Sequence, residues 1–159
     1  MSSKPVEIGS KVRRVILHYR NQYEPSVDKC EYTAGNGACM RTLPVILATL
    51  GCEKNDIITA SRIQSHITHH SDLSDAGTEH IIELCQMALK GYGISDLETC
   101  SHQFTNKQRQ FQFTKKAISN PDGFIVPTIQ AVLQAFYSTD SFESCLIDVV
   151  NRGGDADTT

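Results

Sequence analysis

The sequence lacks several features that would assign it quickly to a class of proteins. It has no tryptophan and no basic run of five or more residues, and its net charge is −3 with a pI near 6.0. We therefore expect no nucleic-acid partner, because such domains carry a basic patch or stripe. No stretch approaches the roughly 18 apolar residues that cross a bilayer. The first residues also lack the apolar segment of a signal peptide. These absences indicate a cytoplasmic protein without a transmembrane segment.

No CxxC pair occurs among the cysteines. The six are Cys30, Cys39, Cys52, Cys85, Cys100 and Cys145. Closely paired cysteines are typical of zinc and redox sites, and a regular framework of them is typical of small secreted domains. Scattered cysteines among apolar neighbours instead favour reduced, mostly buried thiols, which agrees with a cytoplasmic location.

What is present fits one helical domain of ordinary size. The chain has 159 residues, 40% of them hydrophobic and 21% charged, which is normal for a globular protein. Apolar residues recur at three- and four-residue spacing, whereas strand-like alternation is absent. The predicted fold class is all-α, without internal repeats or linkers.

The apolar spacing places the first four helices. An N-terminal helix has the face Ile8, Val12, Val15, Ile16 and Tyr19. The next helix lies within 42–51 and ends at Gly51. A third covers 55–68, begins at Asn55 and carries Ile58, Ile63 and Ile67. A fourth covers 74–91, begins at Ser74 and ends at Gly91. The stretch 101–120 is predicted to be a polar connection.

Two more helices complete the prediction. One lies within 123–140, with Pro127 in its first turn, where the missing N–H costs little. Its apolar face is Ile129, Val132, Leu133 and Phe136. The other begins at Asp140 or Ser141 and ends at Gly153. Its expected buried stripe is Phe142, Cys145, Leu146 and Val149.

Three polar clusters lie at helix ends, where side chains and free N–H groups can reach a ligand. The first is the Asn-Gly turn in "GNGACMR", and the second is the pair His69 and His70. The third is the tail "GGDADTT", whose carboxylates and hydroxyls are hard oxygen ligands of the kind that Mg²⁺, Mn²⁺ and Ca²⁺ prefer. Each has a simpler alternative: a turn before a helix, a surface or capping histidine, or a frayed terminus.

Taken together and in this order, the clusters resemble the ADP-ribosylglycohydrolase family, above all its nitrogen-fixation branch. The resemblance implies a compact, all-α multi-helix bundle that hydrolyses the N-glycosidic bond between ADP-ribose and an arginine side chain. It also implies two divalent cations, Mg²⁺ or Mn²⁺, for which this chain supplies Asp155, Asp157 and Thr158. Substrate contacts are expected from Asn36, Gly37, Met40, His69, Gly153 and Gly154. The implied partners are an ADP-ribosylated protein such as dinitrogenase reductase, ADP-ribose itself, and PII-type signalling proteins.

The resemblance is to an incomplete domain. Residues 1–159 match its middle and late portion, while the family's "GDALG" and "TDDT"-like segments do not occur. The family's catalytic glutamate belongs to the unmatched portion, so no catalytic residue is assigned here. Thr33 and Pro127 stand where the family favours acidic residues. We therefore expect no hydrolysis by the isolated chain. The alternative function is an inactive ADP-ribose-binding or helical interaction module.

Overall fold

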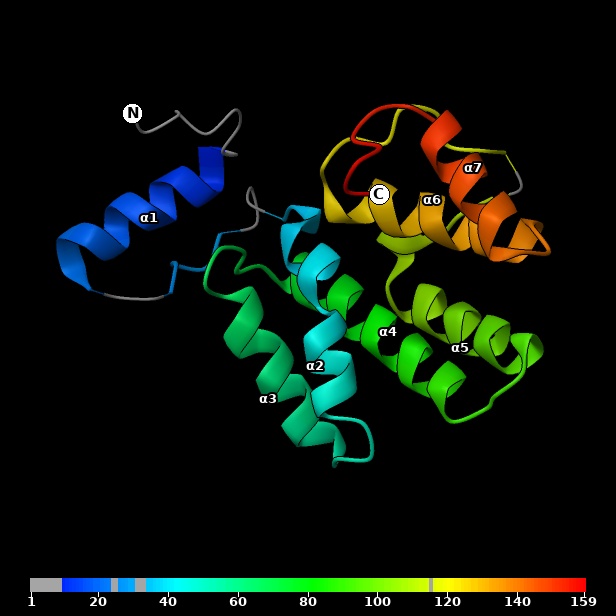
Figure 1. Cartoon of the computed structure of the whole chain (residues 1–159), viewed down its shortest axis with the longest axis horizontal. Coiled ribbons are helices and arrows are strands. Elements are labelled where there is room, and N and C mark those ends of the chain that lie inside the picture. The colour runs from blue at the N-terminus through cyan, green and yellow to red at the C-terminus, as the bar shows by residue number, and fades with distance from the viewer. Residues whose placement is uncertain (1–9, 24–25, 31–33, 115) are drawn as a thin grey trace.

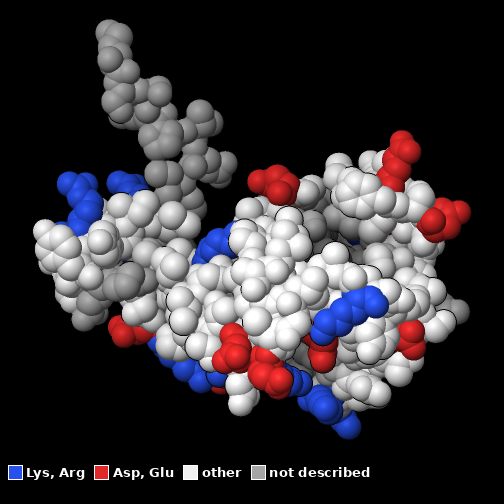
Figure 2. Space-filling view, turned by 60° about the horizontal axis from the view of Figure 1, so that its bottom comes forward, with Lys and Arg blue, Asp and Glu red and all other residues white. Residues whose placement is uncertain are grey.

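The computed structural model describes residues 10–23, 26–30, 34–114 and 116–159. The all-α prediction is confirmed: in these ranges, β-type pairing is limited to one isolated bridge between Gly35 and Phe124. No helix in the described ranges is both long and apolar enough to span a membrane. Charged side chains of both signs are interspersed on the face shown in Figure 2.

The α-helices are α1 (Ser10–Gln22), α2 (Leu43–Ala48), α3 (Lys54–Ser65), α4 (Asp72–Leu89), α5 (Ile94–Lys107), α6 (Ile125–Ser138) and α7 (Phe142–Asn151). The described ranges also contain the 3-10 helices η2 (Asn36–Arg41) and η3 (Arg109–Phe111).

Helix α4 is the centre of the fold. It packs against α2, α3 and η2 and also against α5 and α6, while α7 packs on α6 (Figure 1). The main buried apolar cluster is Ala34, Leu84, Leu97, Phe111, Ile125, Ile129 and Leu133. This core fixes the start of α6 close to η2, and that junction carries the candidate site described below.

Helix α1 lies to one side of this core (Figure 1). The segment that follows it is held to the α3–α4 connection by two backbone hydrogen bonds, from Val27 N to His66 O (2.9 Å) and from Cys30 N to His70 O (2.8 Å). The helix itself was predicted correctly, although Ile8 lies outside the described residues. Val15 is buried, whereas the rest of the described apolar face, Val12, Ile16 and Tyr19, is exposed.

The C-terminal ends of the helices were predicted better than their N-terminal ends. Gly51, Gly91 and Gly153 follow helices with positive φ, as expected of C-terminal glycines. Ser141 caps α7, as predicted. Helix α4 begins earlier than predicted, because the hydroxyl of Ser71, rather than that of Ser74, accepts the capping hydrogen bond.

One further helix start differs from the prediction, and one helix was not predicted. Helix α3 follows Glu53 rather than beginning at Asn55. Helix α5 was missed altogether, since its second half falls in the stretch expected to be a polar connection. Its buried positions are Leu97, Ser101 and Thr105. Serine and threonine are weak helix formers, so an inward face built partly from them gives little apolar periodicity.

Some predicted apolar faces are not covered by the described residues. Val149 of α7 is buried as expected, but Phe142 is 81% exposed and Leu146 48% exposed. Ile63, Ile67 and Phe136 are also exposed. Periodicity identifies the apolar face of a helix, but it does not show whether another element lies against that face.

One cysteine is exposed, and the other five are half-buried. Cys52 is exposed. Burial raises the pKa of Cys39 to about 12, and burial together with the nearby Glu83 carboxylate raises the pKa of Cys100 to about 11. The prediction of mostly buried thiols therefore fails at Cys52 and holds in part elsewhere.

A thiol-reactivity experiment checks these environments. Because the thiolate is the reactive form, we expect Cys52 to react first with a maleimide near neutral pH, and Cys39 and Cys100 to react far more slowly. Peptide mass spectrometry over time gives the order, and Cys52→Ser should remove the fast phase. Rapid labelling of Cys39 in the folded protein would contradict the described burial.

Candidate functional site

The tail of the chain folds back onto the loop that leads into α6 (Figure 1). Asn120 N donates to Arg152 O at 2.7 Å, and Asp155 N donates to Pro121 O at 2.8 Å. These bonds place Asp155 next to the first turn of α6. A Cβ added to Gly123 would lie 2.8 Å from Asp155 Oδ2, so the loop backbone passes directly beside this carboxylate.

Asn36 joins the Asn-Gly turn to this tail. Its side chain is 5% exposed. Its Nδ2 atom lies within hydrogen-bonding distance of three oxygens, namely Thr128 Oγ1 (3.1 Å), Asp155 Oδ2 (3.2 Å) and Thr158 Oγ1 (2.9 Å). The Thr158 hydroxyl in turn donates to the Asp155 carboxylate. We call Asn36, Thr128, Asp155 and Thr158 the Asn36 cluster.

The backbone fixes the position of Asn36 as firmly as the side chain does. Asn36 N donates to Gly123 O at 2.9 Å, and Ile125 N donates to Ala34 O at 2.9 Å. These two bonds join the turn before η2 to the start of α6. The Asn36 cluster therefore stands on the junction of two elements that are far apart in the sequence.

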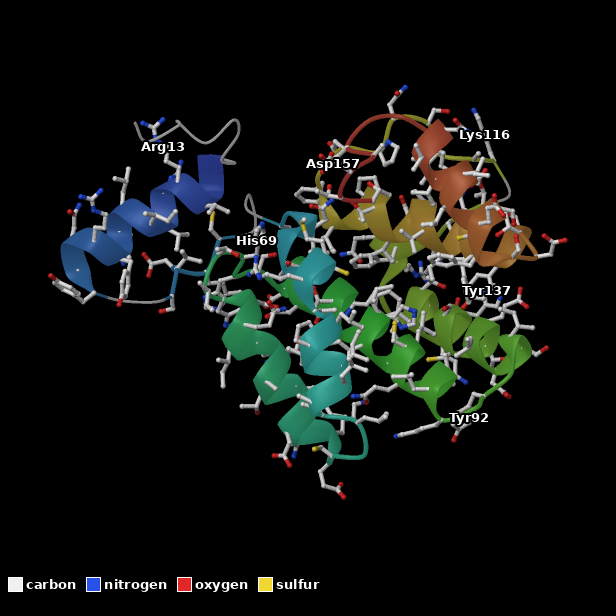
Figure 3. All side chains as sticks on the ribbon, in the orientation of Figure 1. Arg13, His69, Tyr92, Lys116, Tyr137 and Asp157 are labelled. Carbon is white, nitrogen blue, oxygen red and sulfur yellow. The ribbon has the colours of Figure 1, made fainter. Side chains whose placement is uncertain are left out.

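His69 lies beside the same turn (Figure 3). A Cβ added to Gly37 would come within 2.7 Å of His69 Cε1, so only glycine lets the imidazole approach this closely. His69 Nδ1 is 2.7 Å from Thr68 Oγ1. Arg41 donates to both Gly37 O (2.8 Å) and Thr68 Oγ1 (2.6 Å), which ties η2 to the end of α3.

A substitution at Gly37 tests this contact. Gly37→Ala should force the His69 ring to move and destabilise the fold by about 1–3 kcal/mol, as overpacking typically does. Urea unfolding gives the free energy. The alanine should cost less when it is introduced into a His69→Ala background, because the clashing ring is then absent. Equal costs in the two backgrounds would contradict the contact.

The remaining residues of the predicted site lie outside the Asn36 cluster. Asp157 is exposed and makes none of the hydrogen bonds described around Asn36. Met40 is 58% exposed on η2. Gly153 and Gly154 form the turn that returns the tail, with φ values of +73° and +69°.

Sequence reasoning assigned no site role to two residues that the structure places here. Thr128 is 4% exposed and adds its hydroxyl to the Asn36 cluster. Arg41 ends η2 and holds the Asn-Gly turn through its guanidinium. The only signal for Thr128 was its place directly after Pro127, in the first turn of a helix. No feature of the sequence alone connects it with a tail some thirty residues later.

The Asn36 cluster suits a hard divalent cation. Around the Asn36 amide it contains a carboxylate and two hydroxyl oxygens, and these are the kinds of donor that Mg²⁺ and Mn²⁺ prefer. The Thr158 hydroxyl and the Asp155 carboxylate already approach each other very closely. Asp157, two residues from Asp155, offers a second carboxylate at the surface. The donor set therefore fits part of a cation site.

The chain is similar to known proteins both in sequence and in fold. The sequence model of the ADP-ribosylglycohydrolase family matches residues 1–159. The ADP-ribosyl-[dinitrogen reductase] glycohydrolase of Rhodospirillum rubrum is 37% identical over 159 residues, which is 100% of this chain and 53% of that protein. A solved structure described as an ADP-ribosylglycohydrolase-related protein complex superimposes with a TM-score of 0.77 at 28% identity, covering 94% of this chain and 54% of that one.

The chain thus spans about half the length of the relatives it matches. Within that span, the fold agrees with a solved relative and the whole chain matches the family's sequence pattern. The chain belongs to the ADP-ribosylglycohydrolase family.

Proposed function

We propose that this chain supplies part of an enzyme that hydrolyses the N-glycosidic bond between ADP-ribose and an arginine side chain, as in the reactivation of ADP-ribosylated dinitrogenase reductase. The main support for the proposal is the Asn36 cluster, in which side chains of the "GGDADTT" tail contact the Asn-Gly turn. The name of the Rhodospirillum rubrum relative, which specifies an ADP-ribosylated dinitrogen reductase, supports the substrate class. Residues 1–159 would form the middle and late portion of a single domain.

In this proposal Asp155, Asp157 and Thr158 hold Mg²⁺ or Mn²⁺. When bound, such cations orient substrate hydroxyls and lower the pKa of a bound water. Asn36 positions the Asp155 carboxylate and the Thr158 hydroxyl through its amide hydrogens. Cleavage of the glycosidic bond builds positive charge on the ribose, and a fixed carboxylate nearby stabilises that charge.

The substrate-binding residues of the proposal surround the same junction. Gly37 and His69 form one wall, because the imidazole packs directly on the glycine backbone. Gly153 and Gly154 let the tail turn close to the ligand, and Met40 extends the surface along η2. None of the 159 residues is assigned as general acid or base. An ADP-ribosylated protein in the cytoplasm would be the target, with PII-type signalling proteins as candidate regulators.

A second function, ADP-ribose binding without catalysis, is favoured by one feature. Pro127 occupies the first turn of α6 immediately before Thr128, at a position where an acidic residue was expected from the family resemblance. A carboxylate there would stand next to the Asn36 cluster, and proline offers neither charge nor a donor. Binding could then persist while hydrolysis is lost.

A chimeric enzyme distinguishes the two functions. These 159 residues would replace the matching stretch of the Rhodospirillum rubrum glycohydrolase, and release of ADP-ribose from ADP-ribosylated dinitrogenase reductase would be measured with Mn²⁺. We expect release, reduced by about 100-fold or more in Asp155→Asn, the order of loss seen when transition-state electrostatics are removed. Asp140→Asn, which removes the same charge at an exposed position, is the control.

The outcomes of the chimera are distinct. A folded chimera that binds ADP-ribose by calorimetry but releases none supports the binding module. A folded chimera that neither binds nor releases ADP-ribose contradicts both functions. Release that is unaffected by Asp155→Asn would show that the Asn36 cluster is not part of the catalytic site.

A further inference from the structure

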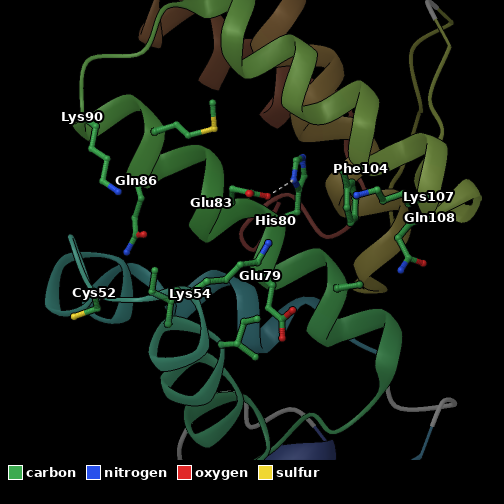
Figure 4. Close-up of a pocket in the computed structure, with 14 residues that line it drawn as sticks. Cys52, Lys54, Glu79, His80, Glu83, Gln86, Lys90, Phe104, Lys107 and Gln108 are labelled. Carbon is green, nitrogen blue, oxygen red and sulfur yellow. Dashed lines mark ion pairs between the residues drawn. The ribbon is translucent and has the colours of Figure 1, made fainter.

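A second site lies away from the Asn36 cluster, in a cavity of about 600 Å³ between α3, α4 and α5 (Figure 4). Its lining includes Lys54 and Cys52 near the start of α3, His80 and Glu83 on α4, and Phe104 on α5. None of the residues of the Asn36 cluster contributes to it. The proposed hydrolase function assigns no role to this cavity.

His80 is the unusual residue of the cavity. It is 2% exposed, and in the described part of the chain its Nδ1 atom makes no close hydrogen bond, only a long ion-pair contact of 4.0 Å with Glu83 Oε2. Its ring is stacked on Phe104 with the centroids 4.0 Å apart. Its other nitrogen, Nε2, lies 3.2 Å from Ser101 Oγ, which is 2.8 Å from the Tyr137 hydroxyl. A buried polar atom without a close hydrogen bond is costly, so the loosely paired Nδ1 is a candidate ligand atom.

The contacts from Nε2 to Ser101 and from Ser101 to Tyr137 are compatible with a tautomer that leaves Nδ1 free to bind a ligand. With its hydrogen on Nε2, the ring donates to Ser101 Oγ and leaves Nδ1 as an unprotonated ligand atom. Histidines that bind metals are usually held in this way, with the distal N–H donated to a neighbouring oxygen. Stacking on Phe104 further restricts rotation of the ring.

Two more ligand groups face this atom. Glu83, three residues after His80 on the same face of α4, places Oε2 4.0 Å from His80 Nδ1. Cys100 comes from α5, and one ligand atom from each of His80, Glu83 and Cys100 lies within 4.8 Å of the others. Figure 4 shows Glu83 beside His80, and a dashed line marks the ion-pair contact between them.

We propose that His80 Nδ1, the Glu83 carboxylate and the Cys100 sulfur bind a divalent cation of the Zn²⁺ class. Imidazole, thiolate and carboxylate are the ligands of zinc, whereas the oxygens of the Asn36 cluster suit a harder ion. Tetrahedral bonds of about 2.0–2.3 Å place ligand atoms roughly 3.3–3.8 Å apart. The observed spacing therefore needs a closure of about 1 Å, and the half-exposed Glu83 side chain can move that far.

Three protein ligands leave the fourth position of the ion open to the cavity. Since the ligands come from α4 and α5, the ion would also cross-link these two helices. In the free protein, burial and the Glu83 carboxylate raise the pKa of Cys100 to about 11. The thiol must lose its proton to bind the ion, so binding releases a proton.

Cobalt substitution tests the site, because a thiolate bound to Co²⁺ gives a charge-transfer band in the near ultraviolet. Chelator-treated protein titrated with Co²⁺ should develop this band at one equivalent, and Zn²⁺ should displace it. Cys100→Ser should abolish the band, whereas Cys52→Ser, which changes the exposed thiol of the same cavity, should leave it intact. Glu83→Gln should weaken the binding by about tenfold or more.

Further controls separate the site from the proposed function and from misfolding. Asp155→Asn should keep the cobalt band, since the Asn36 cluster is not involved. Circular dichroism checks that Cys100→Ser and Glu83→Gln remain folded. The proposal is overturned if the wild-type protein gives no thiolate band, if the band survives in Cys100→Ser, or if it disappears in Cys52→Ser.

Discussion

Replacement of Asp155 by asparagine is expected to lower the Mn²⁺ affinity of the chain by at least about tenfold, because it removes the one carboxylate within the Asn36 cluster. The wild-type affinity should itself be weak, on the order of millimolar, since this stretch offers few protein oxygens. Water proton relaxation during a Mn²⁺ titration measures both values.

The control for this prediction is again Asp140→Asn. It removes an equal charge from an exposed position, so it reports the general electrostatic effect, which salt screens strongly. Similar Mn²⁺ affinities for Asp155→Asn and Asp140→Asn would mean that the ion associates non-specifically with surface charge rather than at the Asn36 cluster. Tight binding of two ions by the wild-type chain would contradict our expectation that these residues form part of a site.

The second large effect is expected at Gly154. Its φ is +69°, and a Cβ at this position would lie 2.1 Å from Pro121 O and 2.6 Å from the Asn120 carbonyl carbon. These are backbone atoms, which cannot move away without distorting the loop, whereas a flexible side chain could. Gly154→Ala should therefore detach the tail from the loop and lower the free energy of unfolding by at least about 2 kcal/mol, more than the left-handed conformation alone costs.

Gly51→Ala is the matched control. Gly51 has a φ of +88°, but nothing lies within 4 Å of an added Cβ. This variant should show only the conformational cost, about 1–2 kcal/mol. Urea unfolding of the two variants isolates the clash as the difference between them. If Gly154→Ala is no more destabilising than Gly51→Ala, the tail does not pack on Pro121 as described.

The helical class of the fold could be predicted from periodicity alone. The glycines that end helices were also predictable, because few other residues readily adopt the positive φ required at a helix C-terminus. The start of α4 was less certain: Ser71 and Ser74 are both good caps, and only the tertiary structure buries Ser74 against Gly35 O. Helix α5 was not predicted, because Ser101 and Thr105 occupy its inward face and weaken the apolar periodicity.

The candidate site could be predicted only in part. Asp155, Thr158 and Asn36 were each selected from local chemistry and from the family resemblance, but no local rule states that they meet. The Asn36–Asp155 contact spans 119 positions of sequence. Thr128 joins them because the Gly35–Phe124 pairing brings α6 to the turn. Asp157, by contrast, is exposed and takes no part in the hydrogen bonds around Asn36.

The site proposed at His80 was missed for a related reason. His80 and Glu83 lie within an amphipathic helix, where polar residues three positions apart are common. Cys100 lies on α5, which periodicity did not predict. Only the packing of α4 on α5 brings the three ligand atoms together.

Paramagnetic broadening of backbone amide signals by Mn²⁺ tests the central claim most directly, because it reports on every residue near the ion at once. We predict that the signals of Asn36, Thr128, Asp155 and Thr158 broaden together at low Mn²⁺, and that Asp155→Asn removes the broadening at all four. Broadening confined to the tail after Gly154, with Asn36 and Thr128 unaffected, would contradict the claim that the Asn-Gly turn and the tail form one cation site.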